Sequence, residues 1–145
     1  MSETITALTI YQPWAWAIME GPKRFENRSW YSRHRGPLLI HAGKSRKSLG
    51  AIQFLRDAGH QCPDESDLVF GAILGVVGQV GCVRPSAAIC EGDIFAEGPW
   101  CHVYRHPRKL SEPVQYRGQQ GYFQVPADVA EHLLCWADLI SEALG

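Results

Sequence analysis

A lysine, a glutamate and an arginine stand close together in the segment Gly21 to Trp30, which reads GPKRFENRSW. If this segment is a strand, alternate side chains share a face, so Glu26 and Arg28 point to the same side. Charged groups on a buried face are costly unless they are paired. We therefore expect Glu26 to pair with Arg28 or with Lys23 at the mouth of the strand. Either this ion pair only orients the fold, or it borders a polar cleft in which the lysine and the arginine meet an anionic or base-like ligand.

Positive charge is concentrated around this segment, although the net charge of the whole chain is −1. Eight basic residues and one acid, Glu26, lie between Lys23 and Lys47, and a weaker basic stretch runs from Arg105 to Arg117. This separation predicts one positive face, which would attract polyanions. The alternative interpretation is that these basic side chains lie on solvated loops.

Other chemistry finds less support in the residue types and their spacing. The five cysteines are an odd number without a C-x-x-C pair, so we expect reduced, mostly packed thiols rather than disulfides or a zinc site. His102 and His106 are four positions apart next to Cys101, but on a strand this spacing separates them by about 13 Å, too far for one metal ion. No glycine-rich phosphate-binding motif is present, and we predict neither a metal nor a cofactor.

The hydrophobic pattern predicts the elements that must position these residues. Four glycines interrupt the apolar run 71–83, which is typical of a strongly bent strand. The last element has one apolar stripe at steps of three and four, which indicates a helix over about residues 127–144. The expected strands are 7–11, 24–31, 37–42, 71–83, 102–105, 114–116 and 122–125, and the other expected helices are 13–20 and 45–58.

This order of elements is too irregular for repeated βαβ units and favours a mainly β fold with flanking helices, an α+β arrangement. We expect a small, mostly antiparallel β-barrel, closed or nearly so, with the C-terminal helix packed outside it through Val129, Leu133 and Ile140. The 145 residues contain no repeat or linker, which predicts a single domain over 1–145. No apolar stretch reaches the ~20 residues of a membrane span, and no signal-peptide pattern is present. We expect a cytoplasmic protein, monomeric rather than oligomeric.

Three motifs resemble the activating signal cointegrator homology (ASCH) domain, a member of the PUA-like superfamily. They are Q-P-W-A from Gln12, G-x-K-x-x-E-x-R from Gly21 and R-G-x-L-x-I-x-A from Arg35, in this order. The stretches 71–80 and 99–110 are similar to later strands of the family, so the resemblance covers about residues 7–125.

The resemblance implies a PUA-like barrel that binds nucleic acid, RNA in the first place and DNA as a possibility, in a cleft beside the G-x-K-x-x-E-x-R strand. Tryptophan and tyrosine side chains could stack on unpaired bases. The residues on family motif positions are Gln12, Trp14, Lys23, Glu26, Arg28, Arg35, Gly36, His41 and Lys44. The nearby basic and aromatic side chains that complete the expected binding site are Trp30, Arg33, His34, Arg46 and Lys47.

Distant members of the superfamily resemble amidohydrolases that deacylate a modified cytidine, which gives an alternative function. Their lysine works with a threonine three residues later, but here that position is Glu26. A carboxylate beside Lys23 favours the charged amine and so disfavours nucleophilic attack by it. If the protein is an enzyme, an amidohydrolase or a ribonuclease, we expect Lys23 and Glu26 to be its catalytic residues. Binding without catalysis remains the favoured prediction.

Overall fold

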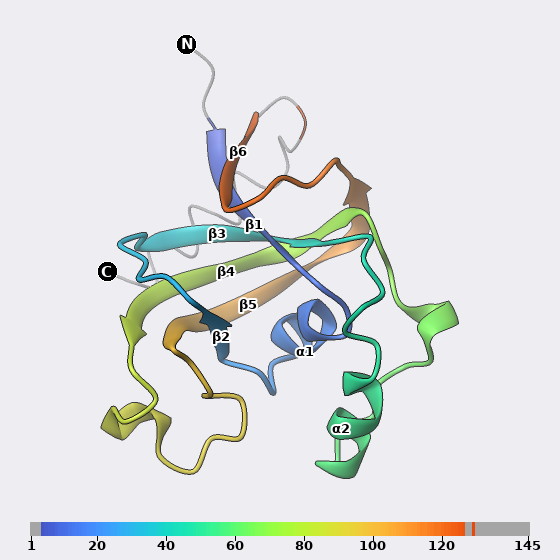
Figure 1. The fold of residues 1–145 in the computed structure, drawn as a ribbon. Helices are drawn as coiled ribbons and strands as arrows, with labels where there is room; N and C mark the ends of the chain where they lie inside the picture. Colours follow the sequence, from blue (N-terminus) through green and yellow to red (C-terminus); the bar gives the residue numbers. More distant parts are fainter. Residues whose placement is uncertain (1–3, 127–128, 130–145) are drawn as a thin grey trace.

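The computed structural model describes residues 4–126 and 129, and within them six strands form one curled sheet (Figure 1). The order of strands across the sheet is β2-β5-β4-β3-β1-β6. The strands are β1 (Thr4–Ile10), β2 (Phe25–Arg28), β3 (Gly36–Ala42), β4 (Ala72–Val83), β5 (Trp100–Gln115) and β6 (Tyr122–Pro126). The helices are α1 (Trp14–Glu20) and α2 (Ala51–Asp57), with short 3-10 turns at Glu65–Asp67 and Ala88–Cys90.

Antiparallel pairing dominates the sheet. Only β1 and β3 are parallel, and every other neighbouring pair is antiparallel. The predicted mainly β fold with flanking helices is therefore confirmed. The predicted C-terminal helix and its packing residues Leu133 and Ile140 lie outside the described residues.

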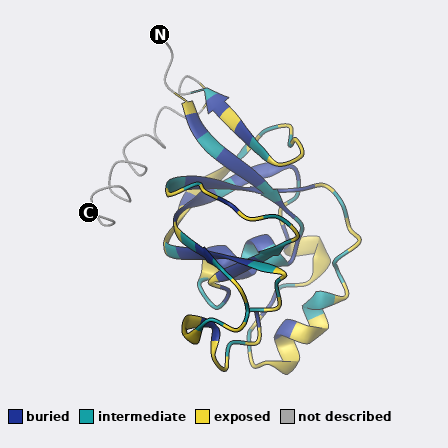
Figure 2. Ribbon diagram, turned by 60° about the vertical axis from the view of Figure 1, so that its left-hand side comes forward, coloured by how far each residue is buried: buried dark blue, intermediate teal, exposed yellow. Residues whose placement is uncertain are grey.

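The apolar faces of the strands build the core inside the curl. Helix α1 packs there through Ile18 and Met19, which contact a cluster that includes Leu8, Ile40 and Val77. Figure 2 shows this arrangement as buried strands, with the exposed face of α2 at the periphery. Helix α2 is shorter than the predicted 45–58, because Gly50 rather than Ser45 precedes its first turn. None of the described helices has the length and apolar composition that a membrane crossing requires.

The predicted bend of β4 is confirmed, and it follows from its glycines. The pairing of β4 with β5 changes register beside Gly75, Gly78 and Gly81, as expected for bulges that curl a sheet. At Gly75 a Cβ atom would collide with the Arg108 carbonyl oxygen and would lie 2.6 Å from Met19 Cε. Only glycine allows β5 and α1 to approach β4 this closely.

The two strands predicted at 102–105 and 114–116 are wrong as separate elements, because β5 is one strand of 16 residues. Pro107 and Pro113 suggested breaks in the chain. Neither proline, however, is paired with β4, so the ladder loses no hydrogen bond at these positions. His106 lies next to Pro107 with a φ of 55°, which marks the irregularity that accommodates the first proline.

The sheet does not close into a barrel, although we expected a barrel that was closed or nearly so. Within residues 4–126, β2 and β6 are the two edges of the sheet and do not pair. Side chains span the gap instead. Arg28 Nη2 on β2 donates to the Thr9 carbonyl oxygen on β1 at 2.7 Å, and the Trp30 ring packs edge-on against Tyr122 on β6, with 5.3 Å between centroids.

The close approach at Gly75 gives a direct test of the fold. We expect Gly75→Ala to lower the free energy of unfolding by about 1–3 kcal/mol, because the added methyl group overpacks the β4–β5 contact. The measurement is urea denaturation followed by circular dichroism. Gly50→Ala is the matched control, since Gly50 has helical φ and ψ angles and open space around it; it should be neutral or stabilising by about 0.4–1 kcal/mol. Equal stability of Gly75→Ala and the unchanged protein would contradict the described packing.

Candidate nucleic-acid interface

Glu26 connects Lys23 and Arg28 through its two carboxylate oxygens. Its Oε2 accepts from Arg28 Nε at 3.0 Å, and its Oε1 lies 3.6 Å from Lys23 Nζ. The Glu26 side chain is 10% exposed and that of Arg28 is 25% exposed. The predicted sharing of one face is therefore confirmed, and one carboxylate balances two partly or fully buried cations.

Lys23 is not at the mouth of a cleft, as we had expected, but is only 4% exposed. Its Nζ donates to the Phe25 carbonyl oxygen and lies 5.3 Å from the Trp14 ring centre and 5.7 Å from that of Phe95. Burial lowers the pKa of Lys23 below its usual value, and the Glu26 carboxylate opposes this shift. Trp14 and Phe95 come from α1 and from the excursion after β4, so their approach to Lys23 depends on the tertiary fold.

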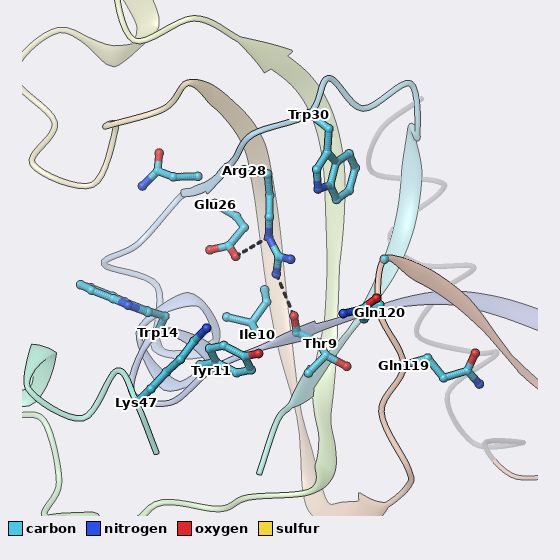
Figure 3. A pocket seen from close by; sticks show the side chains of 12 residues that line it. Thr9, Ile10, Tyr11, Trp14, Glu26, Arg28, Trp30, Lys47, Gln119 and Gln120 are labelled. Carbon is cyan, nitrogen blue, oxygen red and sulfur yellow. Dashed lines mark hydrogen bonds and ion pairs between the residues drawn. The ribbon is translucent and has the colours of Figure 1, made fainter. Parts of the chain in front are cut away.

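A cavity of ≈ 580 Å³ opens in front of the Glu26–Arg28 pair (Figure 3). Its walls come from β1, β2, the start of α1 and the loop before β6, and Figure 3 shows Arg28 bridging Glu26 and the Thr9 carbonyl at its centre. A second cavity of ≈ 410 Å³ shares Trp14, Glu26 and Asn27 with the first, and Lys23 lines it. The first cavity is lined by Thr9, Ile10, Tyr11, Trp14, Glu26, Asn27, Arg28, Trp30, Lys47, Gln119, Gln120 and Gly121.

Two of the predicted stacking residues line the first cavity. Trp14 packs edge-on against Phe54 and Phe95 at centroid distances of 5.9 and 6.3 Å, and it borders both cavities. Trp30 packs against His102 at 4.8 Å, so its ring orientation is fixed from behind. Rings held in this way present a fixed face or edge to the cavity.

The basic residues after β3 are divided among different environments. Lys47 lines the first cavity, where its Nζ lies 4.7 Å from the Tyr11 ring centre. Lys44 and His41 line a third cavity of ≈ 980 Å³ on the other side of β1. Arg46 pairs with Glu65 at 2.7 Å and lines none of these cavities. Lys47 is thus the residue of this stretch that reaches the cavity beside Glu26.

The residues before β3 lie at the opposite end of that strand. The seven residues of β3 separate the two basic groups by about 20 Å, so they do not meet at one cavity, and the single positive face stays a prediction. Arg35 donates to the carbonyls of Ser32 and His34 at 3.0 and 2.8 Å, and the His34 ring bonds the Pro37 carbonyl at 2.9 Å. Arg33, His34, Arg35 and Gly36 line none of the three cavities.

Gln12, which lies on a family motif position, supports the fold from inside. It is 1% exposed. Its Nε2 donates to the Val69 carbonyl at 2.8 Å, and its Oε1 accepts from the Trp16 backbone N–H at 2.9 Å. Both ends of the amide are therefore used to hold α1 against the segment before β4.

The loop 117–121, which reads RGQQG, contributes to the site although we did not predict it. Gln119 and Gln120 from this loop line the first and the third cavities, together with Thr9 and Tyr11 of the β1 end. No local pattern marks these residues as a site, because polar loops with glycine are common between strands. The loop reaches the cavities only because β6 pairs with β1.

Two buried polar residues on β5, His102 and Tyr104, lie behind the cavity. His102 pairs opposite Glu26 in the β2–β5 ladder and is 0% exposed; burial lowers its pKa, which favours the neutral ring. Its Nδ1 and the Tyr104 hydroxyl are buried without a hydrogen-bond partner among the described residues. Buried polar atoms of this kind are rare in proteins, and here they lie on the strand that backs the Glu26 network.

Comparisons with known proteins show to which family this chain belongs. A family model described as the ASCH domain matches residues 8–98. Human activating signal cointegrator 1 is 35% identical over 130 residues, which cover 84% of this chain and 22% of that protein. The mouse protein of the same name is 36% identical over 81 residues, which cover 52% of this chain and 14% of that protein. The chain thus spans about a fifth or less of the length of these relatives.

Solved structures of other proteins have a fold similar to that of this chain. The crystal structure of ASCH from Zymomonas mobilis has a TM-score of 0.50 at 12% identity and covers 90% of this chain and 93% of that chain. A single-residue mutant of that protein has a TM-score of 0.53 at 12% identity, with 92% and 98% covered. At these identities the likeness concerns the fold alone. The family model and the sequence relatives establish more, and the chain belongs to the ASCH domain family.

Proposed function

We propose that this ASCH domain binds nucleic acid with unpaired bases in the cavity beside Glu26 and Arg28, RNA in the first place and DNA as the alternative. The observation that carries this proposal is the composition of the ≈ 580 Å³ cavity. It combines two cations, Arg28 and Lys47, with the aromatic rings of Trp14 and Trp30. Proteins that hold single-stranded nucleic acid use this combination, in which cations contact phosphates and rings stack on bases.

Each group in the cavity has a role that follows from its contacts. Lys47 is exposed at the rim and suits a phosphate contact. Arg28 is fixed by Glu26 and by the Thr9 carbonyl, which suits a base carbonyl or a phosphate at one defined position. Gln119 and Gln120 carry amide groups, which offer both donors and acceptors to a base edge. Glu26 holds Arg28 in place and accepts a hydrogen bond where its carboxylate faces the cavity.

Hydrolysis by Lys23 and Glu26, the alternative that the family resemblance suggests, has less geometric support. A nucleophilic lysine needs a neutral amine that can reach the substrate. Lys23 Nζ donates to the Phe25 carbonyl and is enclosed by Trp14 and Phe95. These contacts favour a lysine that organises the Glu26 network over one that attacks a bound nucleoside.

The binding proposal predicts a difference between two basic residues at opposite ends of β3. We expect Lys47→Gln to weaken the binding of a labelled single-stranded RNA several-fold and to reduce the slope of log affinity against log salt by about 0.7, the loss of one phosphate contact. Arg33→Gln should change neither, because the exposed Arg33 lies away from the cavity. Fluorescence anisotropy with single-stranded and duplex RNA and DNA, repeated across salt concentrations, measures both quantities. An equal loss in the two variants would contradict binding at this cavity.

The Glu26 network predicts a large effect on stability. We expect Glu26→Ala to lower the free energy of unfolding by about 3–5 kcal/mol, because it leaves the buried Lys23 and the partly buried Arg28 without their shared counter-charge. Urea denaturation at neutral pH measures this loss. Glu97→Ala is the matched control, since Glu97 borders the second cavity but is exposed, and it should change stability by less than about 0.5 kcal/mol. Similar stability of both variants would show that the ion pairs do not organise the site.

A further inference from the structure

A threonine and a histidine face one another on the opposite side of β1 from α1. Thr9 and His41 are direct partners in the β1–β3 ladder, and Thr9 Oγ1 lies 3.1 Å from His41 Nδ1. The other ring nitrogen of His41, Nε2, lies 2.6 Å from the Tyr116 carbonyl oxygen. Thr9 is half-buried and lines both the cavity beside Arg28 and the ≈ 980 Å³ cavity across β1, whereas His41 is 1% exposed.

The hydrogen bonds assign the tautomer of His41. A carbonyl oxygen only accepts, so Nε2 carries the hydrogen that the Tyr116 carbonyl receives. In the neutral ring Nδ1 then has the lone pair and accepts from the Thr9 hydroxyl. Burial lowers the pKa of His41 below its usual value, which keeps the ring neutral near pH 7. The result is a hydroxyl bonded to a neutral imidazole that a third group orients, the arrangement of an activated nucleophile.

The surrounding chain holds this pair tightly. A Cβ atom at Gly118 would lie 2.7 Å from Thr9 Oγ1 and 2.8 Å from His41 Cε1, so the loop 117–121 packs directly on the pair and only glycine fits there. The His41 ring also packs edge-on against Phe123 at 5.9 Å. On the other side, Arg28 donates to the Thr9 carbonyl. Backbone and ring are thus fixed before any substrate arrives.

We propose that Thr9 and His41 form a nucleophile and base that take an acyl group from an ester bearing a negative charge. Thr9 Oγ1 forms a bond to the ester carbonyl carbon while its proton passes to His41 Nδ1. The bond from that carbon to the alkoxy oxygen then breaks, and the leaving alcohol takes the proton from His41. Water hydrolyses the acyl-threonine in the second half of the reaction, with His41 as base, and releases the carboxylic acid and the free threonine.

The surroundings of the pair select this class of substrate. The group behind His41 is a neutral carbonyl, which orients the imidazolium but balances its charge less than a carboxylate would; this favours esters, whose leaving groups need less assistance than those of amides. Lys44 and Arg117 line the cavity across β1, and no acidic residue within 4–126 does; Lys47 lines the cavity beside Arg28. These cations favour a negatively charged acyl or alcohol part.

Acylation by the monoester of succinic acid with 4-nitrophenol tests this proposal in the absence of nucleic acid. We expect release of nitrophenol and one succinyl group on Thr9, located by peptide mass spectrometry. Thr9→Val should abolish the acylation at this position and Thr9→Ser should retain it. His41→Gln, which keeps a donor for the Tyr116 carbonyl, should slow it by about 100-fold or more.

Thr6→Val is the matched control for this experiment, because Thr6 lies on the same strand and bonds Gln124 instead of a histidine; it should acylate at the unchanged rate. Melting temperatures establish that each variant is folded, and if His41→Gln does not fold, Thr9→Val decides the question alone. Labelling confined to lysines, or a rate that Thr9→Val leaves unchanged, would overturn the proposal. The nucleic-acid proposal is measured separately, by anisotropy of the unchanged protein, so either proposal can fail without the other.

Discussion

The Glu26 carboxylate is the interaction on which the rest of this structure depends. It lies between Lys23, which is 4% exposed, and Arg28, and a buried cation is costly without a counter-charge. Because one carboxylate must lie close to both cations, it determines the position at which the chain after α1 enters β2. Because Arg28 then reaches across to the Thr9 carbonyl, the same carboxylate determines how the β2 edge of the sheet meets β1.

This dependence explains why an open sheet encloses a cavity. The β2 and β6 edges do not form a ladder within residues 4–126, and side chains rather than backbone hydrogen bonds span the space between them. Ser32 Oγ and the Tyr122 hydroxyl lie 2.5 Å apart, and Tyr122 donates to Gln79 at 2.8 Å. A ladder would fill the gap with backbone, whereas side-chain bridges leave space in front of Arg28 and Trp30. In our account, the ligand enters the gap that the sheet leaves open.

The parts of this arrangement that were predictable from the sequence are those governed by local periodicity. Alternation placed Glu26 and Arg28 on one face, and the glycines of 71–83 indicated the bend of β4. The burial of Lys23 was not predictable, because Trp14 and Phe95 approach it from distant segments. The distribution of the basic residues was not predictable either, because charge counting along the chain ignores the length of β3, which separates Arg33 and Arg35 from Lys44 and Lys47. His41 lies on a family motif position, but its contact with Thr9 depends on the pairing of β1 with β3. The place of the loop 117–121 likewise depends on strand pairing, and local periodicity indicates neither.

The central claim is that nucleic acid occupies the cavity in front of Arg28, and photochemical crosslinking tests it most directly. A single-stranded RNA that carries 4-thiouridine, irradiated in complex with the full chain and analysed by peptide mass spectrometry, reports which side chains contact the bases. Our account predicts crosslinks at Tyr11, Trp14 or Trp30, which line the cavity. Tyr31 and Trp100 form a separate aromatic pair, with Arg84 over the Trp100 ring, and they serve as the internal comparison. Crosslinks at Tyr31 or Trp100, with none at the cavity residues, would contradict the account.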